Sequence, residues 1–99
     1  MTLDILPMSQ KYYFYIIKCF DGTRYYGHTK DLKQRFKDHS CGRVTYTKSK
    51  RPLELIYQEE FDTKAEAFHR EMQFKNGKTR KQTIDKLIKN FASSKMSRV

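Results

Sequence analysis

Residues 11–27 read KYYFYIIKCFDGTRYYG, and this stretch predicts a β-hairpin. Residues 11–20 are rich in aromatic and β-branched side chains, which favour strands. Asp21-Gly22 follows as a turn signal, and residues 23–27 return as a second strand. We therefore expect the fold to begin with two antiparallel strands.

The length of the hairpin loop decides how Tyr15 and Tyr25 are related. If Asp21-Gly22 is a two-residue loop, the two tyrosines point to opposite faces, because side chains alternate along a strand. If the loop is residues 20–22, with Gly22 in the left-handed conformation, Ile17 pairs with Tyr25 and both tyrosines share a face. The sequence permits either loop.

A short helix, a basic loop and a third strand are expected next. Residues 28–39 show helical spacing, and Thr29 or Asp31 can cap the helix start. The residues on one side of this helix are Leu32, Arg35, Phe36 and His39. Residues 40–51 are polar and basic, which indicates a loop with a binding role. Residues 52–61 alternate as a half-buried strand, with four side chains on one side: Leu53, Leu55, Tyr57 and Phe61.

Two further helices complete the expected fold. Thr63 and Glu66 form a Thr-x-x-Glu capping box for a helix to about Lys75, which Asn76-Gly77 ends. A last helix is predicted by apolar residues on one face: Ile84, Leu87, Ile88 and Phe91. The expected fold class is α/β in the α+β sense, a small three-stranded antiparallel sheet flanked by helices in the order β-β-α-β-α-α. One domain is expected at residues 11–91, between a loose segment at 1–10 and a flexible tail at 92–99.

Composition narrows the class of protein. With 99 residues and 37% apolar content, the chain can build one core but not two. The 21 Lys and Arg against 11 Asp and Glu give a formal charge of +10, which points to a polyanionic partner, nucleic acid first. No run of 18 apolar residues and no signal peptide are present, so we expect a soluble, cytoplasmic protein without membrane contact. Cys19 and Cys41 are expected to be reduced thiols.

Three polar side chains occupy positions where a purely structural helix would carry apolar ones. Arg35 and His39 are one helical turn apart on the stripe expected to face the sheet, and an inward arginine needs an anion. Glu71 shares its helical face with apolar residues, where a charge is costly unless it is paired or binds a metal. These positions are candidates for chemistry.

Each candidate also has a purely structural interpretation. Tyr15 and Tyr25 can be packing residues with a hydrated tip. His39 can simply be favourable near a helix C-terminus. The two charged candidates can belong to solvated ion pairs, namely Arg35 with Asp31, and Glu71 with Lys75 or Arg70.

The ordered set of motifs resembles the GIY-YIG nuclease superfamily over roughly residues 11 to 90. It is similar to small stand-alone members related to the nuclease domain of the bacterial excision-repair incision subunit. The matching segments are Tyr13-Phe14-Tyr15 for Gly-Ile-Tyr, Tyr25-Tyr26-Gly27 for Tyr-Ile-Gly, Asp31 to Arg35 with His39 for the arginine helix, Phe68-His69-Arg70-Glu71 for the Arg-Glu pair, and the basic residues after Gly77, Lys81 in particular, for the final helix. Tyr13 and Phe14 depart from the first motif, and Asn76 is a loose candidate for a late asparagine.

The resemblance implies a metal-dependent endonuclease that hydrolyses DNA without strong sequence specificity, in repair or recombination. Arg35 would grip the scissile phosphate, and Tyr25 would hydrogen-bond the phosphate or the water network. Glu71 would hold one Mg²⁺ or Mn²⁺ ion, weakly in the absence of substrate. The general base stays open between Tyr15, whose free pKa of about 10 would have to fall, and His39.

The expected partner is DNA, including branched or damaged DNA. Six basic residues would contact backbone phosphates: Lys48, Lys50, Arg51, Lys78, Arg80 and Lys81. A partner protein supplying specificity is plausible, and the oligomeric state stays open. The main alternative is a catalytically silent nucleic-acid-binding module of the same fold, and a third interpretation is an RNA-scaffold interface.

Overall fold

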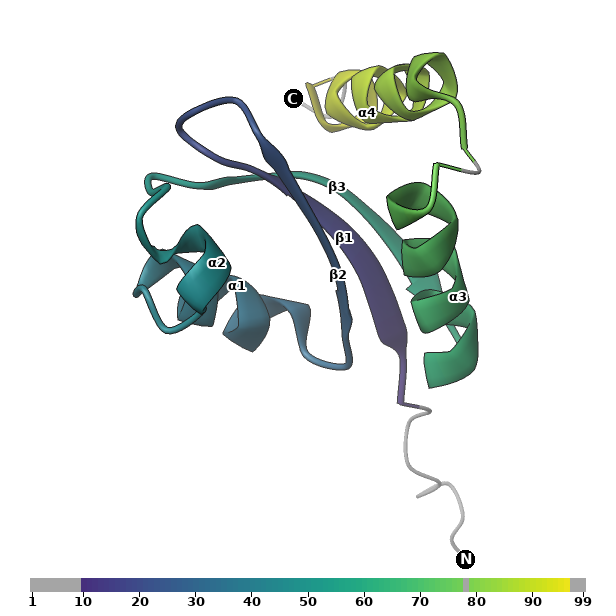
Figure 1. The fold of residues 1–99 in the computed structure, drawn as a ribbon. Coiled ribbons are helices and arrows are strands. Elements are labelled where there is room, and N and C mark those ends of the chain that lie inside the picture. The colour runs from purple at the N-terminus through teal and green to yellow at the C-terminus, as the bar shows by residue number, and fades with distance from the viewer. Residues whose placement is uncertain (1–9, 78, 97–99) are drawn as a thin grey trace, which may run out of the picture.

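The architecture is a three-stranded antiparallel sheet with helices on both faces (Figure 1). A computed structural model describes residues 10–77 and 79–96. The elements in chain order are β1 (Tyr12–Lys18), β2 (Arg24–Thr29), α1 (Leu32–Ser40), α2 (Thr45–Lys48), β3 (Glu54–Phe61), α3 (Lys64–Lys75) and α4 (Lys81–Met96). The strand order is β2-β1-β3, with α1 and α2 on one face and α3 and α4 on the other. The predicted fold class is confirmed. The predicted loose segment at 1–10 lies, except for Gln10, outside the described residues.

The hairpin has the longer of the two loops that the sequence permits. The backbone N–H of Cys19 donates to the carbonyl of Thr23 at 2.8 Å, and Gly22 has a φ of +88°. Ile17 pairs with Tyr25, as the loop at residues 20–22 requires. Tyr15 and Tyr25 therefore share one face of the sheet, the face covered by α1 and α2.

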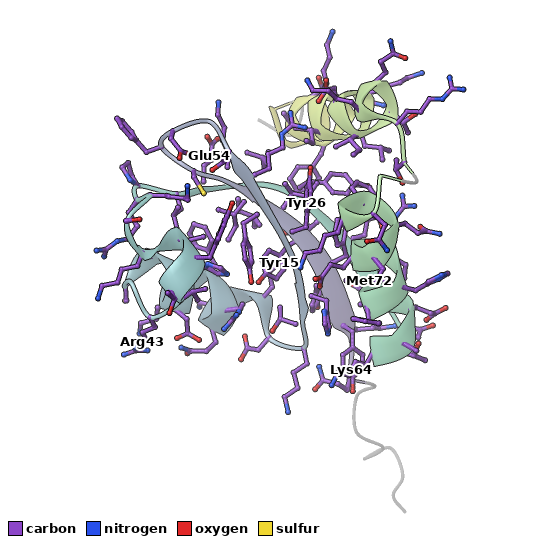
Figure 2. The ribbon with its side chains drawn as sticks, viewed as in Figure 1. Tyr15, Tyr26, Arg43, Glu54, Lys64 and Met72 are labelled. Atoms are coloured by element: carbon purple, nitrogen blue, oxygen red, sulfur yellow. The ribbon has the colours of Figure 1, made fainter. Side chains whose placement is uncertain are left out.

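The main core lies on the opposite face, beneath α3 and α4. Phe14 and Ile16 of β1 are fully buried there, together with Tyr57, Phe74 and Ile84. In Figure 2, Tyr26 points into this core whereas Tyr15 lies on the side of α1. The predicted apolar face of the last helix is confirmed, because Ile84 is buried and its partners pack against the same cluster: Leu87, Ile88 and Phe91.

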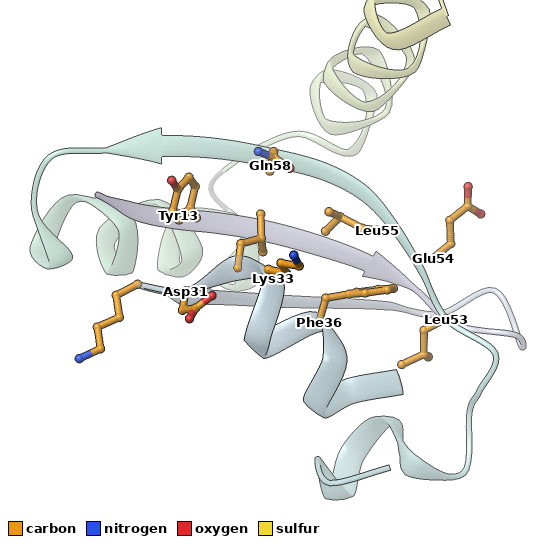
Figure 3. A pocket seen from close by; sticks show the side chains of 10 residues that line it. Tyr13, Asp31, Lys33, Phe36, Leu53, Glu54, Leu55 and Gln58 are labelled. Atoms are coloured by element: carbon orange, nitrogen blue, oxygen red, sulfur yellow. The ribbon is translucent and has the colours of Figure 1, made fainter. Parts of the chain in front are cut away.

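The predicted strict alternation of the third strand is wrong. Ile16 pairs with Tyr57 but Ile17 pairs with Leu55, so Ile56 is an extra residue on β3. An extra residue reverses which side chains face which way on either side of it. Leu55 therefore lines a pocket beneath α1 with Leu53 and Phe36 (Figure 3), whereas Tyr57 enters the main core.

The helix ends largely follow the predicted signals. Asp31 caps α1 by accepting the backbone N–H of Gln34, and the Thr63–Glu66 capping box is present. Two differences lie in segments predicted to be irregular. Residues 45–48 of the expected loop form one helical turn. In addition, α4 continues through Met96, so residues 92–96 of the predicted tail are helical.

Two predictions from composition can be compared with the described residues. Cys19 and Cys41 are both free. Within residues 10–77 and 79–96, no helix combines the length and apolar character needed to cross a bilayer.

Candidate active site

Three aromatic rings converge between the sheet and α1. Tyr15 is 1% exposed and His39 is fully buried. The ring centroids of Tyr25 and His39 are 4.7 Å apart, and those of Tyr15 and Tyr25 are 6.2 Å apart. The hairpin register delivers both tyrosines to this face, and the inward side of α1 delivers the histidine. The structure therefore brings three of the predicted site residues together.

Arg35 joins this cluster through the hydroxyl of Tyr15. Its Nε donates to the Tyr15 hydroxyl oxygen at 3.4 Å, whereas the Asp31 carboxylate accepts the backbone N–H of Gln34. The hydrogen bond to Tyr15, followed by Tyr25, raises the pKa of Arg35 above its ordinary value. The guanidinium is thus held beside two phenols, where a phosphate could reach it, rather than in the alternative ion pair with Asp31.

His39 links the Tyr15 hydroxyl to a residue of α2. The Tyr15 hydroxyl oxygen is 3.2 Å from His39 Nε2, and His39 Nδ1 is 2.8 Å from Thr47 Oγ1. Thr47 is itself fully buried. Burial, with a contribution from Arg35, lowers the pKa of His39 to about 4, so the imidazole is neutral near pH 7. His39 is therefore an internal hydrogen-bonding residue rather than a surface group at a helix end.

The direction of these hydrogen bonds follows from the Tyr15 hydroxyl. Burial raises the pKa of Tyr15 to about 12, so its proton is present, and Arg35 can only donate to its oxygen. Because a buried O–H without an acceptor is costly, the hydroxyl donates to a lone pair on His39 Nε2. His39 Nδ1 then carries the proton of the neutral ring and donates to Thr47 Oγ1. The arrangement is a phenol whose proton points at a neutral imidazole.

Glu71 lies on α3, on the face of the sheet opposite to Tyr15 and His39. It is 6% exposed, and its two oxygens are 2.7 Å from His28 Nδ1 and 2.7 Å from Lys75 Nζ. The pairing with Lys75 is one of the structural alternatives considered above, whereas Arg70 pairs with Glu59 instead. Burial is the main cause that raises the pKa of Tyr15, and the charge of Glu71 adds to it as the smallest of the named causes.

Gly27 explains how groups on two faces of the sheet can act on one another. Tyr15 pairs with Gly27 on β2, which is an edge strand. A Cβ atom at Gly27 would lie 2.5 Å from the Tyr15 hydroxyl oxygen, so the phenol lies directly over this glycine. The next residue, His28, holds Glu71. Residues 27 and 28 therefore join the tyrosine side of the site to the carboxylate side.

The donor set around Glu71 fits a weakly bound divalent ion better than a closed metal cage. Among the described residues, no group of three or more His, Cys, Asp and Glu side chains could hold a metal. Glu71 offers one buried carboxylate, with the imidazole of His28 at one oxygen. Lys75 contacts the other oxygen and balances the negative charge of Glu71. A cation bound there would take most of its ligands from water and phosphate.

The predicted phosphate-contacting residues lie in two regions. Lys50 pairs with Asp21 at 3.0 Å, and Arg51 donates to the carbonyls of Ser40 and Lys48, so both also support the segment around α2. Arg80 and Lys81 line a separate pocket at the start of α4. Lys78 lies outside the described residues. Their contacts with DNA stay predictions.

Sequence reasoning missed two residues of the site. Thr47 lies in a segment expected to be a loop, and nothing in its neighbourhood distinguishes it from Thr45. His28 could have been found, because alternation along β2 places it on the face opposite Tyr25, where α3 and Glu71 lie. A polar residue facing a buried carboxylate is a natural partner for it.

The low pKa of His39 makes folding sensitive to acid. The pKa of His39 is 6.5 in the unfolded chain and about 4 in the folded chain. Between these two pH values the unfolded state binds the proton and the folded state does not, so stability is lost as the pH falls through this window. The shift corresponds to about 3 kcal/mol. We expect urea unfolding at pH 7 and pH 4.5 to show a larger loss for the wild type than for His39→Gln, which does not titrate. Equal losses in both proteins would contradict the buried, neutral imidazole.

Comparison with known proteins identifies the family of this chain. Residues 11–85 match the GIY-YIG catalytic domain. A UPF0213 protein of Staphylococcus saprophyticus is 50% identical over 66 residues, covering 66% of this chain and 80% of the relative. A UPF0213 protein of Pediococcus pentosaceus is 42% identical over 86 residues, covering 86% and 90%. The solution NMR structure of protein EF2693 from E. faecalis aligns with a TM-score of 0.55 and 36% identity, covering 83% of this chain and 86% of that one. This chain belongs to the GIY-YIG family.

Proposed function

We propose that this protein is a metal-dependent endonuclease that hydrolyses DNA phosphodiester bonds without strong sequence specificity. Membership of the GIY-YIG family implies endonuclease chemistry and DNA as the substrate. The observation that carries the proposal is the hydrogen-bonded series Arg35, Tyr15, His39, in which a fixed cation, a phenol and a neutral imidazole meet in one buried site. The proposal includes a role in DNA repair or recombination and a partner protein that supplies specificity.

Tyr15 and His39 would act as a pair on the attacking water. As the water oxygen forms its bond to phosphorus, the water proton passes to the Tyr15 oxygen and the Tyr15 proton passes to His39 Nε2. The leaving oxygen departs with the electrons of the broken P–O bond and takes a proton from solvent. Because the pKa of Tyr15 is about 12 and that of His39 about 4, neither group alone is a good base at neutral pH. The negative charge of a bound phosphate would offset the effect of Arg35 on His39 and so favour protonation of the imidazole.

Arg35 and Tyr25 would hold the phosphate. A guanidinium presents two parallel N–H donors to phosphate oxygens and stays charged at any physiological pH. Developing negative charge on the non-bridging oxygens would then be stabilised by a cation that is already in place. Tyr25 lies beside Arg35 and can donate its hydroxyl proton to the same phosphate.

Glu71, with His28 beside it, would hold the divalent ion. When bound, such an ion supplies charge stabilisation to the phosphate and to the leaving oxygen. Glu71 would provide the carboxylate and His28 would orient it through the existing hydrogen bond, while the ion would replace Lys75 at the other oxygen of Glu71. We expect little binding of Mg²⁺ or Mn²⁺ without DNA.

One observation favours the alternative of a catalytically silent DNA-binding module. Both oxygens of Glu71 are already occupied by protein groups, and this pairing satisfies the buried charge without a metal. A chain with this arrangement could keep its basic surface and fold while having lost turnover. Cleavage assays separate the two functions.

The decisive experiment compares cleavage of duplex, single-stranded, flap and junction DNA with Mg²⁺ and with Mn²⁺. We expect at least one substrate to be cut, and Arg35→Ala and Glu71→Gln each to lower the rate about a hundredfold or more. Circular dichroism should show that both variants stay folded, since neither substitution removes a large apolar side chain.

The outcomes distinguish three situations. Absence of cleavage by the wild type on every substrate, together with retained DNA binding, would support the silent module. Equal cleavage by the wild type and both variants would point to a contaminating nuclease. Loss of cleavage in Arg35→Ala with full activity in Glu71→Gln would show that Glu71 does not hold the metal ion, and it would support Arg35 as part of the phosphate site.

A further inference from the structure

Tyr46 of α2 is an exposed aromatic side chain that the proposed chemistry does not use. It is 50% exposed, although tyrosine rings are usually covered over most of their surface. Among the described residues, only Phe20 and Phe68 are comparably exposed large apolar residues. Tyr46 differs from them in its position, because it lies next to the predicted site.

A continuous row of rings leads from Tyr46 to Tyr15. The ring centroid of Tyr46 is 5.6 Å from that of Tyr25, which in turn is 6.2 Å from that of Tyr15. Tyr25 also contacts His39. Tyr46 thus continues the buried aromatic cluster to the surface, so a group bound on Tyr46 would lie near a phosphate held by Arg35.

The surroundings of Tyr46 are positively charged. Lys50 Nζ is 5.3 Å from the centre of the Tyr46 ring. Lys48 and Arg43 are exposed on the same segment. Asp21 pairs with Lys50 and Asp38 pairs with Arg43, so the excess of positive charge around the ring comes from Lys48 and Arg51. A neutral aromatic ring flanked by cations suits a ligand that combines a flat ring with a phosphate, as a nucleotide does.

The segment that carries Tyr46 is firmly attached to the rest of the fold. Thr47, the next residue, is buried and bonded to His39. Arg51 donates to the carbonyls of Ser40 and Lys48, and the backbone N–H of Phe20 donates to the carbonyl of Lys50. Tyr46 is therefore presented on a rigid support, so stacking on it would cost little conformational entropy.

We propose that Tyr46 stacks on an unpaired nucleobase of the DNA strand that is to be cut, and that the protein thereby selects single-stranded or branched DNA over continuous duplex. Inside a continuous duplex both faces of each base are covered by its neighbours, so a protein ring stacks at lower energetic cost where a base is unpaired. This inference rests on the proposed function and names its substrate class.

Binding without cleavage tests it. Fluorescence anisotropy in EDTA gives the Kd of the wild type, Tyr46→Leu and Tyr46→Phe for three labelled ligands of equal length: single-stranded DNA, blunt duplex, and a strand of abasic sugars that keeps every phosphate. We expect Tyr46→Leu to weaken single-strand binding roughly five- to a hundredfold. Tyr46→Phe should bind like the wild type, and all three proteins should bind the duplex and the abasic strand alike.

Other patterns overturn the inference. Unchanged single-strand binding in Tyr46→Leu would show that Tyr46 takes no part, and equal weakening on all three ligands would show that it only supports α2. Both results leave the proposed nuclease intact, because they concern base recognition alone. If the wild type binds none of the ligands, the proposed function fails together with this inference. Thermal melts of the two variants confirm that the fold is retained.

Discussion

Replacing Tyr15 with phenylalanine is expected to slow DNA cleavage about a thousandfold or more, with an intact fold. The substitution removes the one hydroxyl that connects the guanidinium at 3.4 Å with His39 Nε2 at 3.2 Å. It keeps the ring, which is 1% exposed, so packing against the neighbouring rings is preserved. Single-turnover cleavage at saturating protein measures the chemical step, and urea unfolding measures the stability.

A substitution of Thr47 is expected to have a smaller effect on the same proton path. Thr47→Val has the same shape but cannot accept the proton of His39 Nδ1, so the tautomer that leaves Nε2 free is no longer favoured. We expect a loss of about tenfold in cleavage and an altered pH profile, whereas Thr47→Ser should behave like the wild type. If Tyr15→Phe cuts within tenfold of the wild type, the proton path through Tyr15 is wrong and the phenol is a packing residue.

The fold was largely predictable where one residue type decides the local geometry. Gly22 can adopt a positive φ at little cost, and this allows the three-residue loop that puts Tyr15 and Tyr25 on one face. The Thr63–Glu66 pair likewise specifies the start of α3 through its own hydrogen bonds. By contrast, the extra residue on β3 has no local signal, because Ile56 suits either face and only the pairing with β1 fixes its position.

The site was predictable only in part, because its residues depend on tertiary contacts. Tyr15, Arg35 and His39 were candidates since their types and spacing point to chemistry, and the structure brings them together. Nothing in the sequence shows that His39 is held by Thr47, a partner on a different helix. The partner of Glu71 was more accessible, because alternation along β2 places His28 on the face that α3 covers.

Replacing Gly27 with alanine is expected to damage both stability and cleavage. The added Cβ would lie 2.5 Å from the Tyr15 hydroxyl oxygen and 2.7 Å from its Cζ atom, far inside van der Waals contact. The Tyr15 ring is enclosed by Tyr25, His39 and Arg35, so it can yield only by disturbing them. We expect the free energy of unfolding to fall by about 2 kcal/mol. Cleavage should fall about a hundredfold or more, because the displaced hydroxyl loses its alignment with His39.

Gly22→Ala is the matched control for this substitution. Gly22 has a φ of +88°, and no atom lies within 4 Å of the place that an added Cβ would take, so alanine there meets backbone strain without a steric clash. We expect it to lower stability by about 1 kcal/mol and to leave the cleavage rate nearly unchanged. If Gly27→Ala also keeps the wild-type rate, the Tyr15 phenol does not need its place against the edge strand.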